Sequence, residues 1–512
     1  MKLYSKTILV CLGAACLLAS PSKTFAFAML GPVQPWMQAT NGVIRADDIG
    51  GPMEIGSGYR WNVPVLTYGF DQSFLDYFGT NGVADVEGAM EIFNSLPPAS
   101  QIELMDYSTD SQQMNNVAAS QLLLDLKSKT LQLLLEHMGL AQPTRYIFAI
   151  GQWTNALCPP PYQPSAENGP INWGEWAIPD FIYLKNFDPQ TLQASHYVND
   201  VLYYGYIIRY VIPNSTLTQN YVYPVSVDPF VNSYTAVADI YDLHVGGHYI
   251  GLTRDDVGGL AYLYSTNRVN HEQLLAGVVG SGTNAGAFVN GAWRPGVDKV
   301  TFIPHPVDFV SGIFLPATNI FTDRYLTNGM VHSQQLARIV LQPDFLFRAG
   351  DVKPAVPDFP YFDRTGTTNW LNNAAANGNT NLAGPGVIQP PVQIVFNKLG
   401  PSFYQFADQP VYEHANYWGS FDSSTNPPIV YPVQPTNTVE MTVRLWLTPK
   451  RGWAQSFDWQ PSGLPGTVFA LQTSTNLTSW TTLITTTNNG SVSTFFATFP
   501  TGSQRFYRLV PQ

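Results

Sequence analysis

Helical and strand-like patterns alternate in the first half of the chain. The apolar run VPVLTYGF at 63–70 predicts a strand, and apolar residues spaced three and four apart predict a helix over 83–94. Residues 122–140 place leucine on nearly every side of a helix, which is typical of a fully buried one. Residues 199–212 are apolar but rich in β-branched and aromatic side chains, so their pattern fits either a strand or a helix.

The second half of the chain shows the two-residue period of β-strands. Residues 439–448 alternate apolar and polar side chains, which predicts a strand with one buried face. Further short β-like runs, separated by turn residues, lie at 300–303, 337–341, 468–473, 481–486, 492–499 and 505–510. Closely spaced strands of this kind near the C-terminus are typical of an antiparallel β-sandwich.

These patterns predict an α+β N-terminal region followed by a β-rich middle region and a C-terminal antiparallel β-sandwich. The low-complexity segment NNAAANGNTNLAGPG predicts a linker between the last two regions. We expect a signal peptide at 1–28 and an α+β domain at 29–270. A β-rich or irregular middle region at 271–371, the linker at 372–386 and a β-sandwich region at 387–512 follow. The final module of the sandwich region is expected at about 455–512.

The composition of the 512 residues indicates many short elements joined by turns. The chain has 41 glycines and 40 prolines, and 45% of its residues are hydrophobic, which excludes a disordered protein. Only 12% of the residues are charged and the net charge is −11. An acidic surface repels phosphate backbones, so nucleic acid is not expected as a partner.

The N-terminus has the three parts of a secretory signal peptide. Lys2 and Lys6 precede an apolar run at 8–18, and Ala26-Phe27-Ala28 matches the A-x-A cleavage pattern. Thr24-Phe25-Ala26 offers a second cleavage site. We therefore expect a secreted protein, either periplasmic or on the outer cell surface, with no transmembrane segment after the signal peptide is removed.

Removal of residues 1–28 changes both the charge and the cysteine content. Three lysines are lost and no acids, so the net charge goes from −11 to −14. Of the three cysteines only Cys158 is left, so the mature chain cannot form an internal disulfide. Buried apolar area must then stabilise the fold, and a chain of this length can supply it.

The most specific chemical motif is HVGGHYIGL at 244–252. It resembles the zinc-binding helix HExGHxLGL of matrixin-like zincins, which implies a zincin-like N-terminal fold. The resemblance also implies zinc ligands at His244 and His248, because residues four apart share one face of a helix. Two positions depart from the motif: Val245 replaces the general-base glutamate, and Arg254 replaces the third ligand. An exported zinc-dependent endopeptidase is therefore one candidate function, with no catalytic residue assigned.

A hairpin is the alternative structure for the same segment, and we expect it rather than the helix. Gly246-Gly247 lies between two β-prone runs, 238–245 and 248–252, which is typical of a two-residue hairpin turn. In that hairpin the two histidines point to opposite faces and cannot share a metal ion. The next residues, Thr253-Arg254-Asp255-Asp256, predict a helix N-terminus with a capping box, in which both aspartates are structural.

Four longer segments resemble a group of large secreted bacterial proteins. They are GLTRDDVGGLAYLYS, RPGVDKVTF, QPDFLFRAGD and the terminal LQTSTNLTSW…QRFYRLV, and the resemblance covers nearly the whole mature chain. It implies no particular activity. The terminal module is similar to a small β-sandwich appended to many secreted bacterial proteins, which implies surface display or attachment.

The expected function is a non-catalytic extracellular or cell-envelope protein with a binding or structural role. Its partner would be a cell-surface polymer, a glycan or another protein, and it would need no cofactor, whereas the peptidase alternative would need zinc. A glycan-binding protein is a further candidate, because Trp153, Trp173 and Trp176 lie close together in the sequence and could stack on sugars. Buried aromatic residues are the more common case.

Overall fold

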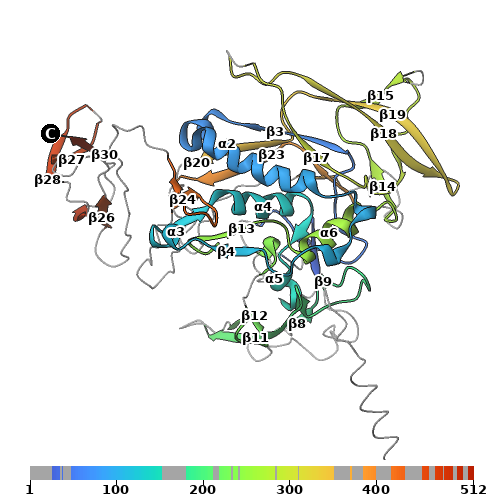
Figure 1. Ribbon diagram of the computed structural model, residues 1–512, viewed down its shortest axis with the longest axis horizontal. Coiled ribbons are helices and arrows are strands. Elements are labelled where there is room, and N and C mark those ends of the chain that lie inside the picture. The colour runs from blue at the N-terminus through green and yellow to red at the C-terminus, as the bar shows by residue number, and fades with distance from the viewer. Residues whose placement is uncertain are drawn as a thin grey trace, which may run out of the picture.

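The structure is a computed structural model, and Figure 1 shows its ribbon. It is rich in β-strands, which form several separate sheets with helices packed beside them, as the sequence predicts. The structure describes residues 26–34, 37, 48–152, 180–211, 218–231, 235–239, 243–282, 285–308, 311–350, 369–371, 385–398, 417–432, 453–459, 468–476, 478–487, 493–499 and 506–511.

Four parallel strands form the central sheet. Their order is β17-β3-β20-β23, with β17 at Thr301–Pro304, β3 at Val65–Phe70, β20 at Phe345–Gly350 and β23 at Val392–Asn397. The predicted strands at 63–70 and 300–303 are therefore confirmed. The sequence assigns these four strands to three separate regions of the chain, and the structure joins them in one sheet.

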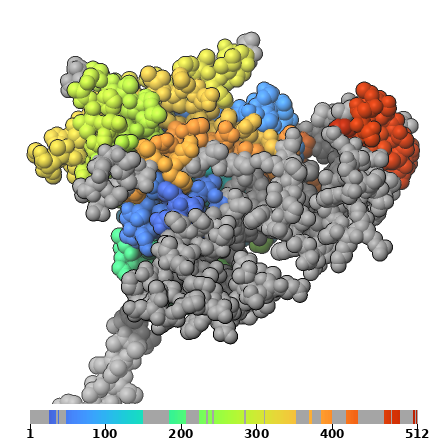
Figure 2. Space-filling view, turned by 180° about the vertical axis from the view of Figure 1, so that it is seen from behind, coloured from blue at the N-terminus to red at the C-terminus, as the bar shows by residue number. Residues whose placement is uncertain are grey.

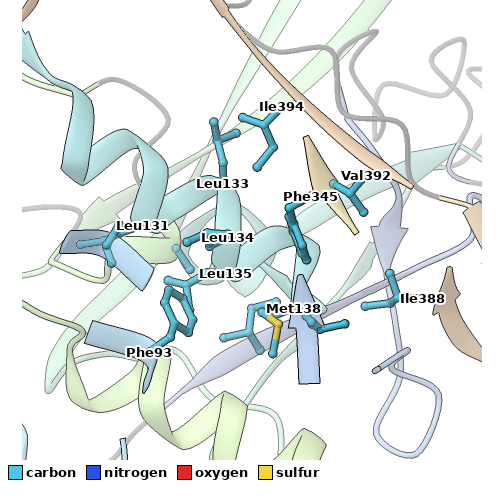
Figure 3. Packing of buried hydrophobic residues seen from close by; sticks show 14 of the residues in the cluster. Phe93, Leu131, Leu133, Leu134, Leu135, Met138, Phe345, Ile388, Val392 and Ile394 are labelled. Carbon is cyan, nitrogen blue, oxygen red and sulfur yellow. The ribbon is translucent and has the colours of Figure 1, made fainter. Parts of the chain in front are cut away.

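Two helices, α2 (Gln72–Ser95) and α4 (Leu126–His137), lie beside the central sheet (Figure 1). The predicted helix at 83–94 is the second half of α2. Figure 3 shows leucines of α4 packed with residues of the sheet, among them Phe345 and Ile394. Every leucine of α4 is buried, as expected for a helix that is apolar on all sides.

The helix α4 begins later than its leucine pattern predicts. Residues Leu123–Asp125 form a short strand, β5, and the Asp125 carboxylate accepts a hydrogen bond from the Ser128 amide at 2.8 Å. This cap fixes the first helical residue at Leu126. The helix ends at His137, two residues before Gly139, whose φ of 103° lies in the left-handed region.

The first described strand, β1 (Phe27–Gly31), is an interior strand. It pairs with three short strands, which are β2 (Gly51–Pro52), β6 (Leu140–Ala141) and β9 (Asn186–Phe187). All five residues of β1 are buried. The helix α6 (Arg254–Tyr264) packs against it.

The segment with the ambiguous pattern at 199–212 is a strand. It forms β11 (Val201–Val211), which pairs with β12 (Thr218–Ser226) on one side and with β10 (Tyr197–Val198) on the other. Its β-branched and aromatic side chains suit a strand. Nearby, β7 (Ala149–Gln152) pairs with β8 (Asp180–Tyr183).

Five antiparallel strands form a second large sheet. Their order is β14-β16-β18-β19-β15, with β14 at Asn270–Gln273, β16 at Gly291–Arg294, β18 at Ala317–Thr327, β19 at Met330–Val340 and β15 at Val278–Gly280. Strands β18 and β19 form a long hairpin that projects from the molecule (Figures 1 and 2). Its turn is Asn328-Gly329, and both residues have positive φ, as a tight hairpin turn requires.

A buried arginine connects this second sheet to the N-terminal part of the chain. The Arg60 guanidinium forms a 2.8 Å ion pair with Glu272 on β14, and both side chains are fully buried. It also donates to the carbonyl oxygens of Leu263, Arg268 and Arg294 at 2.9–3.0 Å. One side chain thus joins α6, β14 and β16.

The predicted C-terminal strands are present. β27 (Val468–Ser474) lies between β28 (Thr481–Thr487) and β30 (Phe506–Pro511), and β26 (Trp453–Trp459) pairs with β29 (Ser493–Phe499). These are two antiparallel sheets, and their packing as a sandwich stays a prediction. The predicted strand at 439–448 lies outside the described residues, as does most of the predicted linker.

Among the residues that the structure describes, no helix combines the length and the apolar character needed to cross a membrane.

Candidate functional site

The histidine motif does not form a helix. The Gly247 amide donates to the His244 carbonyl at 2.8 Å, which closes a turn, and β13 (Gly247–Tyr249) follows. The predicted hairpin is also wrong, because β13 pairs with the distant β4 (Gln112–Met114) and not with the described residues of 238–245. Within that stretch, Val237–Asp239 forms a 3-10 turn.

Gly246 explains why the turn leads to β4. Its φ is +73°, a value that favours glycine, and a Cβ placed on it would lie 2.5 Å from the Asn115 carbonyl oxygen. The Asn115 amide also donates to the Gly246 carbonyl at 2.7 Å. The turn is therefore pressed against the start of α3 (Asn116–Ser120), which directly follows β4.

The two histidines lie in different environments. His244 is exposed in the turn, whereas His248 is only 1% exposed and lies on β13. The Nε2 atom of His248 lies 3.1 Å from the Ser423 hydroxyl, and its ring meets Phe421 edge-on at 5.8 Å. Because the segment is not a helix, the two histidines do not share a helical face from which both could bind one zinc ion. Zinc binding at His244 and His248 stays a prediction.

The other positions of the zincin motif have structural contacts. Arg254, at the place of the third ligand, donates to the carboxylate of Asp200 at 3.1 Å and to the carbonyls of Leu104 and Tyr107 at 3.2 Å. Val245 occupies the general-base position in the turn. Within the described ranges there is no group of three or more His, Cys, Asp or Glu residues that could hold a metal ion.

We expect the two histidines to differ in their effect on stability. Replacing the buried His248 by alanine should lower the free energy of unfolding by about 1–3 kcal/mol, because it removes a packed ring and a polar contact. His244→Ala should change it by less than about 0.5 kcal/mol, since that side chain is exposed. Denaturant unfolding measures both. Stoichiometric zinc in the wild-type protein that is lost in the His244→Ala variant would instead support the peptidase alternative.

The predicted capping box at the start of α6 is confirmed. The Thr253 amide and hydroxyl both donate to the Asp256 carboxylate, at 2.9 and 2.6 Å. Asp256 also accepts from the amides of Val237 and Ala238 at 3.0 and 2.9 Å, so it fixes the 3-10 turn to the helix. Burial raises the pKa of Asp256.

Asp239, at the end of the same 3-10 turn, is a second buried carboxyl group. It accepts from the amide and the hydroxyl of Thr144 at 2.9 and 2.7 Å. Burial raises its pKa to about 8, and the nearby Asp256 adds to the effect. Asp239 thus holds a proton near neutral pH and connects the turn to α5 (Pro143–Ile147).

A buried acidic cluster lies close to the histidine motif, and the sequence did not indicate it. Asp85 on α2 accepts from the hydroxyls of Ser420 and Tyr431 at 2.6 and 2.8 Å. Asp125, before α4, accepts from the hydroxyl of Ser128 at 2.5 Å. Ser128 accepts in turn from an amide of β13, the strand that carries His248. Ser420 ends β24 (Tyr417–Ser420), which pairs with β25 (Ile429–Val430) and with β5.

The two carboxyl groups of this cluster have raised pKa values. Burial raises the pKa of Asp85 to about 6, although Lys127 and the two hydroxyl donors act in the opposite direction. Burial and the charge of Asp85 raise the pKa of Asp125 to about 7. Both groups therefore take up protons at mildly acidic pH. The cluster lies inside the fold, so it couples pH to stability.

One face of the five-stranded sheet, here called the outer face, carries several exposed apolar side chains. Because side chains alternate along a strand, the residues paired opposite one another share a face. The outer face carries Ile320, which is 67% exposed, Val331 (65%), Ile339 (47%), Val279 (43%) and Trp293 (41%). The opposite face of the same strands holds the buried residues Asp323, Leu336, Arg338 and Val340.

The outer face is nearly uncharged. Between the apolar residues, β18 and β19 present Thr318, Thr322, Ser333 and Gln335, and Arg324 is the charged residue at these positions. His271 on β14 lies against Trp293, edge to face at 5.6 Å. The exposed apolar residues form two groups: Val279 and Ile320 lie on either side of Ala337, and Trp293 and Val331 lie on either side of Leu326. Contiguous exposed apolar residues with few charges are typical of a surface that binds a partner.

Comparison with known proteins gives no match: no protein-family model, no curated protein and no solved structure is similar to this chain.

Proposed function

We propose that this chain is an exported, non-catalytic binding protein of the cell envelope or the extracellular space, and that it binds another protein through the outer face. The observation that carries the proposal is the set of exposed aliphatic residues that β18 and β19 present on one face of the sheet, Ile320, Val331 and Ile339. The signal-peptide pattern and the resemblance to secreted bacterial proteins support export. The two C-terminal antiparallel sheets would pack as an attachment module.

The chemistry of the outer face favours a protein over a glycan. Sugar-binding surfaces rely on aromatic rings that stack on the sugar, and the described part of the outer face has Trp293 as its single aromatic ring apart from His271. Isoleucine and valine instead suit an apolar protein surface. Because Arg324 is the one charged side chain between them, the matching surface of the partner needs few charges. The candidate sugar-stacking residues Trp153, Trp173 and Trp176 lie outside the described residues.

A site-specific cross-linker tests the proposed surface. We expect a photoreactive side chain at Ile320 to cross-link a defined envelope protein in exporting cells, and the same side chain at Ile250 to give no such product. Ile250 is the matched control because it is also isoleucine and is 56% exposed, but lies next to β13. Equal cross-linking from both positions would contradict the proposal.

Binding to the purified partner is a second test of the proposed surface. The double variant Ile320→Glu, Ile339→Glu should weaken binding by about tenfold or more, because it puts two charges into an apolar contact. The Ile250→Glu variant should bind as the wild type does. If insoluble cell-wall polysaccharide retains the protein and the double variant binds it equally well, the glycan-binding alternative is favoured instead.

A further inference from the structure

The start of β1 is built into the interior of the protein. Ala26, Phe27 and Ala28 are 0%, 2% and 1% exposed. Phe27 pairs with Phe187, and Ala28 pairs with both Asn186 and Ala141. These residues therefore connect two neighbouring strands, β6 and β9.

The side chain of Phe27 also packs against α6. Its ring lies 5.2 Å from the ring of Tyr262. Gly259 on the same helix faces it so closely that an added Cβ would lie 3.0 Å from the Phe27 Cβ. Without Phe27, this close contact between helix and strand would be replaced by a cavity, which destabilises a packed interior.

The two cleavage sites that the sequence allows differ in what they remove. Cleavage between Ala28 and Met29 removes Phe27 and Ala28 together with their pairs to β9. Cleavage between Ala26 and Phe27 leaves the whole of β1 (Phe27–Gly31) in the mature chain. The second cut removes the buried Ala26 but keeps every residue of β1, whereas the first cut also removes two residues of the strand.

A buried carboxyl group lies at the same place. Asp255 of α6 is 1% exposed, and its Oδ2 atom accepts from the Asn199 amide at 2.6 Å. Its Oδ1 atom is buried without a hydrogen bond. Burial raises the pKa of Asp255 well above its usual value, whereas the backbone amides of Asn199 and Ala26 lower it. The Ala26 amide is a backbone hydrogen-bond donor to this carboxyl group, and a cut after Ala26 would remove that donor. The same cut would create an amine on Phe27, one peptide unit further along the chain.

We propose that the exported chain is cut between Ala26 and Phe27, and that the new α-ammonium group of Phe27 pairs with the Asp255 carboxylate. A signal-type peptidase would add one water molecule across the peptide bond, so that Ala26 leaves with a carboxyl group and Phe27 gains the amine. Pairing with a cation compensates a buried carboxylate for its lost hydration. The inference rests on the proposed export of the chain.

The N-terminal sequence of the protein recovered outside the cytoplasm tests the site of the cut. We expect it to begin Phe-Ala-Met-Leu-Gly. A protein that begins at Met29 overturns the inference but leaves the proposed function intact. A full-length chain that stays in the cytoplasm refutes the proposed export and, with it, both proposals.

Purified chains with defined starts test the ion pair. Released from a fusion, chains can begin at Thr24, Phe27 or Met29. The chain that begins at Phe27 should have the highest melting temperature, since extension to Thr24 moves the ammonium group away from Asp255 and the start at Met29 removes part of β1.

Variants of Asp255 separate the ion pair from packing. Asp255→Asn should abolish the difference in melting temperature between the starts at Thr24 and Phe27. Asp200→Asn is the matched control, because Asp200 is close to Asp255 but its side chain is 36% exposed, and it should keep that difference. If the starts at Thr24 and Phe27 melt at the same temperature in the wild-type sequence, the proposed pair is refuted.

Discussion

Replacing Arg60 by methionine is expected to lower the free energy of unfolding by about 3–5 kcal/mol, the range found when one partner of a buried ion pair is removed. The Glu272 carboxylate would stay buried without its cation, and the carbonyls of Leu263, Arg268 and Arg294 would each lose a donor. Unfolding by denaturant, followed by tryptophan fluorescence, measures the change.

Two further variants test the cause of this loss. Arg324→Met removes a solvent-exposed arginine from the second sheet and should cost less than about 0.5 kcal/mol. The double variant Arg60→Met, Glu272→Met should be more stable than Arg60→Met alone, because it leaves no unpaired charge inside the protein. A single Arg60 variant that is no less stable than the Arg324 variant would contradict this explanation.

The second large effect concerns pH: the protein should become less stable as pH rises from about 4 to 8. Burial raises the pKa of Asp85, Asp125 and Asp239 to about 6, 7 and 8, so the folded state binds these protons more tightly than the unfolded state does. The stabilisation is fully present below the unfolded value of 3.8 and is lost as pH rises through the folded values. Because one pKa unit corresponds to about 1.4 kcal/mol, the loss should amount to several kcal/mol.

Variants identify the groups that are responsible. Asp125→Asn replaces a protonated carboxyl by a neutral amide of similar shape, so it should flatten the dependence of melting temperature on pH between about pH 4 and 7. Asp71→Asn is the control, because the pKa of Asp71 is lowered and its contribution is lost only as pH falls below the usual range of a carboxyl group. If the melting temperature of Asp125→Asn depends on pH as steeply as that of the wild type, Asp125 is not one of the groups responsible.

The sequence predicts those parts of the fold whose signals are local. The leucines of α4 lie within one helix, and the capping box at Thr253 lies within one helical turn. Both predictions are confirmed. The start of α4 was missed because the Asp125 side chain, rather than the apolar pattern, determines it. The paired glycines correctly indicate a turn, but the strand that pairs with β13 has the sequence Gln112-Gln113-Met114, which carries no strand signal.

The candidate surfaces were harder to predict because charged residues lie on the inner face of the second sheet. Asp323 is buried on β18 and pairs with Arg294 at 2.9 Å, while Arg338 on β19 pairs with Asp344 at 2.5 Å. Charged residues on the buried face and isoleucines on the exposed face are exceptions to the usual alternation and weaken its signal in the sequence. The acidic cluster was missed for a different reason: Asp85 and Tyr431 meet only in the folded chain.

The order of the central sheet has a consequence for the time at which the chain can fold. β3 is synthesised early but pairs with β17 and β20, which follow much later in the chain. The edge strand β23 is the last of the four to be synthesised. Contacts between such distant segments form slowly, since a long loop must close before they are made. A chain that emerges from a translocation channel would therefore stay open until about residue 397 is through. Under the proposed export, folding this slowly would keep the chain unfolded long enough to pass through the channel.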